Sequence, residues 1–389
     1  MLWGVGTSSY QVEGNIDHAD WSRFERTITP GFQGAGKACE HYLHALDDIR
    51  QVAALGLNAY RFSVEWSRIE PAPGATDQAA LAHYRQMVDT ARNCGLEPVV
   101  TLHHFTLPKW LEAEGGVLSP NFTTHFARLC KVVGSALDAT WWVTINEPMV
   151  LAVMGYLLGE WPPGRRSLTE VNRVGRALAR AHRQAFQILH QIDPARRVGV
   201  AKHLTRIWPH RPHHLMDQLG SRLQDAVFNQ YFYQWTAGTH DFLGVNFYAR
   251  SYARGLTQVR RSRPGERLSQ MGWVTDSADL AAVLSWLKPM GLPVLITENG
   301  IATLDEDLRC DYLRSHVRVL LEARQQGLDV AGYLYWTLWD NFEWREGWGP
   351  AFGLCPPPSA GQRFSWRPAA RLLAQLCAND GAELLGPHA

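Results

Sequence analysis

The chain has 389 residues, and 38 Lys and Arg against 37 Asp and Glu give it a net charge of +1. This length fits two or three average domains or one large α/β barrel. The near-zero charge excludes the general basic excess that nucleic acid or an anionic membrane would require. No run of about 18 apolar residues is present, so we expect no membrane span. The one basic run, residues 260–264, contains Pro264 and is interpreted as a solvated loop.

The amino-terminal sequence "MLWGVGTSSYQ" has neither a basic start nor a long apolar stretch, so we expect no secretory signal peptide. The six cysteines form no Cys-X-X-Cys pair and have no His partner at zinc spacing. We therefore expect reduced thiols in a cytoplasmic protein, with no metal and no organic cofactor.

Short apolar runs alternate along the chain with stretches of helical period. The predicted strands are residues 2–6, 59–64, 98–102, 141–145, 197–201, 242–247, 294–297 and 330–336. The predicted helical stretches are residues 40–56, 77–95, 121–137, 168–191 and 307–327. Several of these begin after Asp, Asn or Ser and end at Gly, as capping predicts. Strands that are apolar almost throughout are typical of a parallel sheet buried on both faces.

Eight strands that alternate with helices favour an α/β protein built as a single (β/α)8 TIM barrel over residues 1–389. A doubly wound open sheet is the alternative, but no Gly-X-Gly-X-X-Gly or phosphate-binding loop follows any predicted strand. No Pro/Ser-rich linker divides the chain. The barrel predicts an active site at the carboxyl ends of the strands.

Polar residues follow nearly every predicted strand. They include Gln11, Arg61, Glu65, His103, His104, Asn146, Glu147, His203, Asn246, Tyr248, Glu298, Asn299, Asp340, Asn341 and Glu343. One such residue commonly means only that the chain has reached water. Seven or eight strand ends with similar chemistry indicate a site, because all these ends meet at one mouth of a barrel.

Two strands run directly into a glutamate with an asparagine beside it, in "VTINEP" (143–148) and "LITENG" (295–300). Glu147 and Glu298 follow the fourth and seventh strands, nearly opposite each other across the mouth. Two opposed carboxylates suit glycoside hydrolysis, in which one acts on the leaving oxygen and the other on the anomeric carbon. A structural ion pair, with Arg61 nearby, is the alternative for either glutamate.

With these motifs the sequence resembles glycoside hydrolase family 1, the retaining β-glucosidases and β-galactosidases. The resemblance runs nearly end to end, in the family's order, through "LWGVGTSSYQVEG", "ACEHYLHALDDIRQVAALGLNAYRFSVEWSRIEP", "TLHHFTLPKWL", "TINEP", "DFLGVNFY", "LITENGIA" and "GYLYWTLWDNFEW". It implies hydrolysis of terminal, non-reducing β-D-glucosides, with β-galactosides and β-fucosides as further candidates. The implied reaction is a double displacement through a covalent glycosyl-enzyme.

The resemblance also implies a role for each matching residue. Glu147 matches the acid/base, Glu298 the nucleophile, and Arg61 and Tyr248 the groups that contact the nucleophile. The implied sugar-binding residues are Gln11, His104, Asn146, Asn246, Trp336, Glu343 and Trp344. Of these, Asn146 matches the ligand of the sugar 2-hydroxyl and Trp336 the platform under the ring. His103 lies outside the pattern and is interpreted as a buried, hydrogen-bonded core histidine.

The chain is short for this family, notably between residues 200 and 241, so we expect an open leaving-group side. Glu343 stands in the loop where members that act on 6-phosphosugars carry Ser, and a carboxylate would repel a phosphate dianion. We therefore expect a neutral β-glycoside or oligosaccharide substrate and no nucleic acid. The sequence leaves open glucose against galactose or fucose, the natural aglycone, hydrolysis against transglycosylation, and the oligomeric state. A non-catalytic sugar-binding barrel is the alternative of another class, but it would lack one glutamate.

Overall fold

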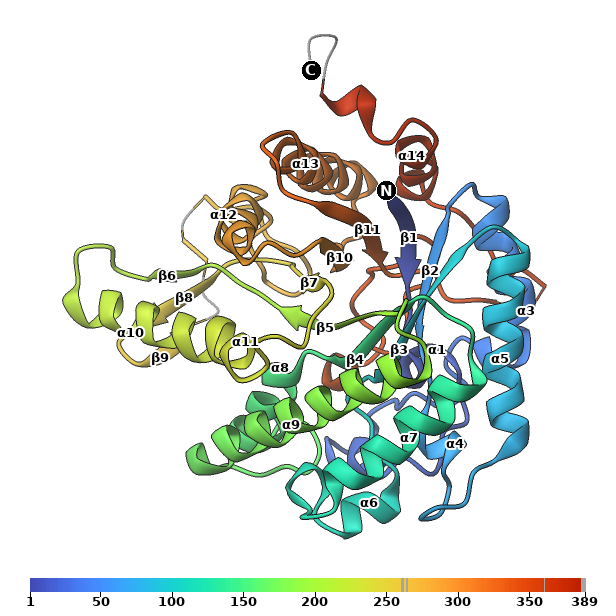
Figure 1. The fold of residues 1–389 in the computed structure, drawn as a ribbon. Helices are drawn as coiled ribbons and strands as arrows, with labels where there is room; N and C mark the ends of the chain where they lie inside the picture. The colour runs from blue at the N-terminus through green and yellow to red at the C-terminus, as the bar shows by residue number, and fades with distance from the viewer. Residues whose placement is uncertain (260–261, 264, 360, 386–389) are drawn as a thin grey trace.

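A computed structural model describes residues 1–259, 262–263, 265–359 and 361–385. Eight parallel strands close into a barrel in the order β1-β11-β10-β7-β5-β4-β3-β2 (Figure 1). They are β1 (Leu2–Gly6), β2 (Ala59–Ser63), β3 (Glu97–His103), β4 (Trp141–Asn146), β5 (Arg197–His203), β7 (Leu243–Asn246), β10 (Val294–Asn299) and β11 (Val330–Trp336). The predicted (β/α)8 TIM barrel is confirmed, with its eight strands in the predicted places, and the open-sheet alternative is wrong.

Helices surround the barrel. The longer ones are α3 (His41–Ala54), α5 (Gln78–Asn93), α7 (Phe122–Ala136), α9 (Leu168–Ile192), α10 (Leu215–Asp225), α12 (Ala278–Leu287), α13 (Glu306–Gln325) and α14 (Pro368–Ala378). The shorter ones are α1 (Ser9–Val12), α2 (Asp20–Phe24), α4 (Trp66–Ile69), α6 (Lys109–Ala113), α8 (Pro148–Val153) and α11 (Tyr231–Trp235). Single 3₁₀ or π turns occupy Glu25–Thr27, Gly116–Leu118, Met154–Leu158, Ala226–Gln230, Lys288–Met290, Trp344–Glu346 and Ala382–Leu384.

Capping side chains begin three of the long outer helices, α5, α9 and α13. The Asp77 carboxylate accepts from the amides of Ala79 and Ala80 at the start of α5. Asp305 accepts from the amide of Leu308 in the same way at the start of α13. These bonds satisfy amides that the helix itself leaves without partners, so each helix begins at a defined residue after its strand.

Apolar side chains fill the barrel toward the amino-terminal ends of its strands. Ala59, Val99, Trp141, Val143, Ala201, Phe242, Leu295 and Leu334 form one buried cluster. The rings of Trp141 and Phe242 meet edge to face, with centroids 5.0 Å apart. Gly4 lets β1 and β2 approach, because a Cβ there would lie 2.3 Å from the carbonyl oxygen of Ala59. Since this end is closed by packed side chains, polar groups can gather only toward the carboxyl ends.

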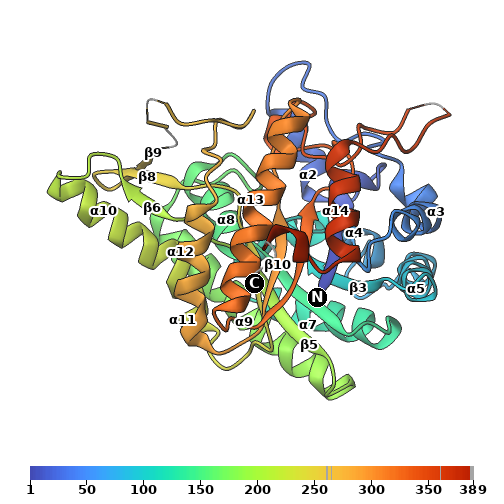
Figure 2. The same ribbon diagram turned by 90° about the horizontal axis from the view of Figure 1, so that it is seen from above.

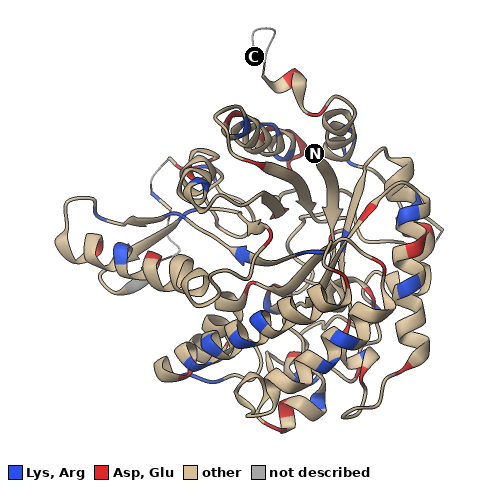
Figure 3. Cartoon of the chain, in the orientation of Figure 1, with Lys and Arg blue, Asp and Glu red and all other residues tan. Residues whose placement is uncertain are grey.

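A small sheet stands beside the barrel, next to α10. It consists of β6 (Ile207–Pro209), β8 (Ser251–Arg254) and β9 (Thr257–Val259), and Figure 2 shows it on the outer side of α12. The loop predicted at residues 260–264 lies mostly outside the described residues, since 260, 261 and 264 are not described. Both signs of charge are distributed over the outer helices (Figure 3). Within the described part of the chain, no helix has the length and apolar character needed to cross a membrane.

Candidate active site

The predicted site residues gather at the carboxyl ends of the strands. Glu298 is the penultimate residue of β10, and Glu147 directly follows β4. Arg61 lies within β2 and is fully buried. Asn146 and Asn246 are the last residues of β4 and β7. Strands that are distant in the sequence therefore place five functional groups in one polar cluster.

Glu298 is held by two strong donors. Arg61 Nη1 donates to Glu298 Oε1 at 2.6 Å, and the Tyr248 hydroxyl donates to Oε2 at 2.6 Å. Arg61 is itself fixed, because its Nε donates to Thr101 Oγ1 and its Nη1 also donates to the carbonyl oxygen of Thr297. Burial of Glu298 raises its pKa, Arg61 opposes this, and the charge of Glu147 adds to it, giving a pKa of about 7.

Glu147 is presented by a strained piece of backbone. Its φ of 44° and ψ of 59° are left-handed, and Pro148 then begins α8. Phe105 and Trp344 at the same mouth also have positive φ, of 73° and 51°. Non-glycine residues rarely adopt this conformation unless their surroundings enforce it, and such residues concentrate at functional sites.

Two asparagines connect the glutamates. The Thr297 hydroxyl donates to Asn246 Oδ1 at 2.7 Å, which orients the amide so that Nδ2 faces the site. Asn246 Nδ2 then donates to Glu147 Oε1 at 2.9 Å and to Asn146 Oδ1 at 3.1 Å. Arg61 Nη2 donates to the same Asn146 oxygen at 2.8 Å. One continuous hydrogen-bond network therefore links the two carboxyl groups.

A histidine that the sequence analysis left without a role also meets Glu147. His203, the last residue of β5, places Nδ1 3.3 Å from Glu147 Oε1. Burial raises the pKa of Glu147, whereas a charged His203, the Asn246 hydrogen bond and Lys202 lower it. The lowering influences prevail over burial, so the pKa of Glu147 lies below its ordinary value. The available sequence signal was the position of His203 at a strand end.

Gln11 and Glu343 form a second polar pair. Gln11 Nε2 donates to Glu343 Oε2 at 3.1 Å and to the carbonyl oxygen of Phe342 at 2.9 Å. The Ser8 hydroxyl donates to Gln11 Oε1 at 2.7 Å, which sets the direction of that amide. Burial and the charges of Glu346 and Glu298 raise the pKa of Glu343 well above its ordinary value. The pair presents several polar atoms suited to sugar hydroxyls.

The ring of His104 lies near two tryptophans. It is nearly parallel to those of Trp336 and Trp344, with centroids 5.8 Å and 6.2 Å away. Its Nε2 accepts from Asn146 Nδ2 at 3.1 Å, so the ring proton belongs on Nδ1. That buried Nδ1 has no partner among the described residues, and burial lowers the pKa of His104 well below its usual range. A neutral donor is thus available to a ligand.

His103 behaves differently from its neighbour. It is buried as predicted and contacts Phe126 edge to face. Neither ring nitrogen has a hydrogen-bond partner among the described residues, so the prediction of a hydrogen-bonded core histidine is wrong on that point. Burial lowers its pKa to about 4, which keeps the ring neutral.

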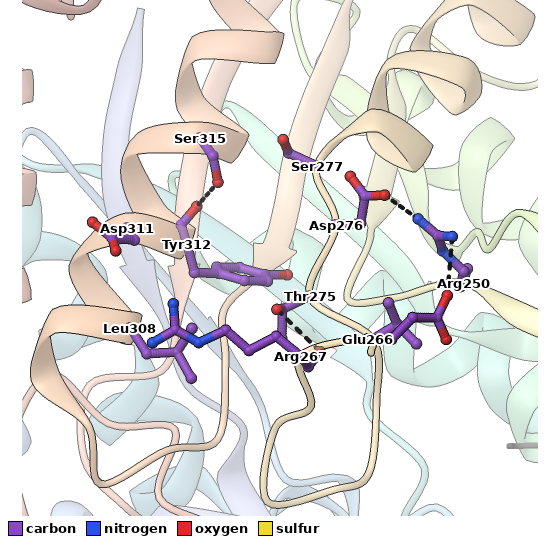
Figure 4. A pocket seen from close by; sticks show the side chains of 11 residues that line it. Arg250, Glu266, Arg267, Thr275, Asp276, Ser277, Leu308, Asp311, Tyr312 and Ser315 are labelled. Atoms are coloured by element: carbon purple, nitrogen blue, oxygen red, sulfur yellow. Dashed lines mark hydrogen bonds and ion pairs between the residues drawn. The ribbon is translucent and has the colours of Figure 1, made fainter. Parts of the chain in front are cut away.

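A separate cavity of about 520 Å³ is lined by none of these site residues (Figure 4). Its most buried cation, Arg250, pairs with Glu266, Asp276 and Asp279. Its Tyr312 donates to the carbonyl oxygen of Tyr248, so this wall supports the active site from behind. Among the described residues, no group of three or more His, Cys, Asp or Glu side chains could hold a metal ion.

A closed (β/α)8 barrel whose mouth holds two linked, buried carboxyl groups belongs to the class of barrel glycoside hydrolases. The sequence profile of glycosyl hydrolase family 1 matches residues 1–237 and 210–356. The chain belongs to this family and is a β-glycosidase.

Relatives of known sequence and structure agree over nearly the full length. β-Glucosidase A of Thermotoga maritima is 28% identical over 457 residues, covering 98% of each chain. The β-glycosidase structure from Pyrococcus horikoshii is 34% identical with a TM-score of 0.90, covering 97% of this chain and 93% of that one. The Thermotoga maritima β-glucosidase in complex with glucoimidazole is 27% identical with a TM-score of 0.89, covering 98% of each.

Proposed function

We propose that the chain is a retaining β-glycosidase that hydrolyses terminal, non-reducing β-D-glucosides, with Glu298 as nucleophile and Glu147 as acid/base. The observation that carries this proposal is the contrast between their surroundings. Glu298 has a permanent cation, Arg61, at 2.6 Å, whereas Glu147 receives neutral amide N–H and an imidazole. The relatives named β-glucosidase support the choice of glucosides.

One proton is shared by the two glutamates at rest. Burial of Glu147 favours its protonated form, whereas His203, the Asn246 hydrogen bond and Lys202 favour the carboxylate. A neutral Glu147 no longer raises the pKa of Glu298, so Arg61 and Tyr248 stabilise Glu298 as the carboxylate. A double displacement requires the proton on Glu147 and the charge on Glu298, and Arg61 and Tyr248 hydrogen-bond to the Glu298 carboxylate.

In the first step Glu298 attacks the anomeric carbon while Glu147 gives its proton to the leaving oxygen. The Glu298 charge disappears in the ester, so the hydroxyl of Tyr248 and the guanidinium of Arg61 become free to contact the sugar ring region. Glu147, now a carboxylate, removes a proton from water, and that water releases the sugar with its original configuration.

The glycone is held by the two polar groups beside the glutamates. Gln11 and Glu343 offer donors and acceptors for the hydroxyls that distinguish sugars, and His104 Nδ1 offers a further donor. Asn146 lies beside Glu147, where a hydrogen bond to the 2-hydroxyl would strengthen in the transition state. Trp336 provides the apolar surface under the ring.

A panel of α- and β-4-nitrophenyl glycosides tests this proposal. We expect cleavage of the β-glucoside, and proton NMR of the first-formed product should show the β anomer. The proposal also requires carboxyl groups about 5–5.5 Å apart in a ligand complex. A first-formed α anomer, or a separation beyond about 6.5 Å, would exclude a retaining reaction.

6-Phosphoglucosides are expected to be poor substrates. A phosphate dianion near Glu343 would be repelled by the charges of Glu346 and Glu298, which already raise the pKa of Glu343. We expect kcat/KM to fall by about tenfold or more relative to the plain glucoside, since 1.4 kcal/mol of lost binding corresponds to tenfold. Glu343→Ser should bring kcat/KM for the 6-phosphoglucoside closer to kcat/KM for the plain glucoside. Equal or higher kcat/KM for the phosphorylated substrate would contradict the prediction.

We also infer that residues 1–389 form one catalytic domain. Strands from the two ends of the chain, β1 and β11, pair with each other and close the barrel. A cytoplasmic location belongs to the same proposal, supported by six cysteines that are all unpaired.

A further inference from the structure

His203 is held firmly at the mouth of the barrel. Its ring is nearly parallel to that of Tyr248, 6.2 Å away, and meets Phe228 edge to face at 5.7 Å. Its backbone carbonyl oxygen accepts from Nζ of the buried Lys202, which also donates to the carbonyl oxygen of Phe228. Both the ring and the backbone are therefore oriented before any ligand arrives.

Two nitrogen atoms converge on one oxygen of Glu147. Asn246 Nδ2 lies 2.9 Å from Oε1, and Thr297 prevents that amide from turning. His203 Nδ1 lies 3.3 Å from the same Oε1, a distance typical of catalytic contacts that tighten when substrate binds. Because Oε1 already accepts one N–H bond and faces a second ring nitrogen at 3.3 Å, it is a poor site for a proton, and the acidic proton belongs on Oε2.

We propose that His203 is a positioning residue for Glu147, donating Nδ1–H to Oε1 so that Oε2 carries the proton delivered to the leaving group. This inference rests on the proposed role of Glu147 as acid/base. When the C1–O bond breaks, the Oε2 proton passes to the leaving oxygen. When water attacks C1 and the ester to Glu298 breaks, the water proton returns to Oε2. Oε1 keeps its two donors throughout.

Other charged and titratable groups face this pair from every neighbouring element. They are Lys202 of β5, Tyr248 after β7, Glu298 of β10 and Glu343 after β11, and Asp225 of α10 acts on Lys202. Lys202 donates to backbone oxygens, and Tyr248 donates to Glu298. Their hydrogen bonds are thus directed elsewhere, which leaves His203 and Asn246 to orient the Glu147 carboxyl group.

Replacing His203 tests the proposal through the pH profile. His203→Phe keeps a ring against Tyr248 and Phe228 but removes the donor. The Glu147 carboxylate then loses a hydrogen bond that favours its charged form, so its pKa rises. With phenyl β-glucoside, which needs an acid, the alkaline limb of kcat/KM should move up by about 0.5–1 pH unit. His203→Asn, which restores an N–H, should return the limb toward that of the unaltered enzyme.

A second substrate separates this effect from a structural one. 2,4-Dinitrophenyl β-glucoside needs no proton on its leaving group, so the alkaline limb of its kcat/KM should stay in place in all three proteins. Unchanged phenyl glucoside profiles in folded His203→Phe enzyme would overturn the proposal. Equal shifts in His203→Phe and His203→Asn would also overturn it, and His203→Leu can replace the Phe variant if that one does not fold. If instead the role of Glu147 is wrong, a Glu147→Ala enzyme will retain its activity on phenyl glucoside.

Discussion

Glu298→Gly is expected to abolish hydrolysis of β-glucosides and, when azide is added to 2,4-dinitrophenyl β-glucoside, to produce an α-glycosyl azide. The substitution removes the group that attacks the anomeric carbon and opens space on that face. Arg61 loses its anionic partner at 2.6 Å, so the vacated space favours a small anion. Loss of the nucleophile should lower kcat on the order of 10⁴-fold or more.

The matched control is Glu298→Gln, which is nearly the same size. It leaves no room for azide, so it should stay inactive with and without the anion. NMR of the product gives the anomeric configuration, and circular dichroism shows whether each variant is folded. A β-azide from Glu298→Gly would reverse our assignment of the two glutamates.

The barrel could be predicted because its strands are long, apolar and regularly spaced between capped helices. The small sheet of β6, β8 and β9 was not predicted, since strands of three or four residues show no period. Helix α12 was also missed. Much of its sequence, "ADLAAVLSWL", is apolar, so no clear polar stripe distinguishes its exposed side from its buried side.

The site divides in the same way between what is local and what is not. Which residues lie at strand ends can be read from the chain, and the barrel then brings them together. The side-chain atoms that face each other cannot be predicted from the sequence, because the orientation of the Asn246 amide depends on Thr297, a residue 51 positions later. The contact of His203 with Glu147 likewise joins residues from two different strands, and no sequence motif predicts it.

The two glutamates show why residue type alone does not assign a role. Both lie at the carboxyl end of a β-branched strand and both are buried. Only the neighbours differ, with Arg61 and a tyrosine hydroxyl around Glu298 and an amide and an imidazole around Glu147. The Arg61 guanidinium stays charged at any accessible pH, so it favours the ionised form of Glu298 throughout. The surroundings of Glu147 allow its proton to leave and return.

Glu147→Ala should separate the two chemical steps. An activated leaving group such as 2,4-dinitrophenolate departs without a proton, so Glu298 should still form the glycosyl-enzyme. Phenyl β-glucoside needs the acid, and its kcat/KM should fall by about 10²–10⁴-fold. Without a base for water, the glycosyl-enzyme should accumulate, seen as a burst of dinitrophenolate followed by slow turnover.

Azide should restore turnover of that variant, because an anion needs no base, and it should attack from the side that Glu147 has vacated. The product is then the β-glycosyl azide, of retained configuration, opposite to the product of Glu298→Gly. Glu147→Gln is the matched control, since its amide fills the same space and can still contact Asn246 and His203 but can supply no proton. It should lose phenyl glucoside activity to a similar degree while responding less to azide. An α-azide from Glu147→Ala, or unchanged phenyl glucoside activity, would show that Glu147 is not the acid/base.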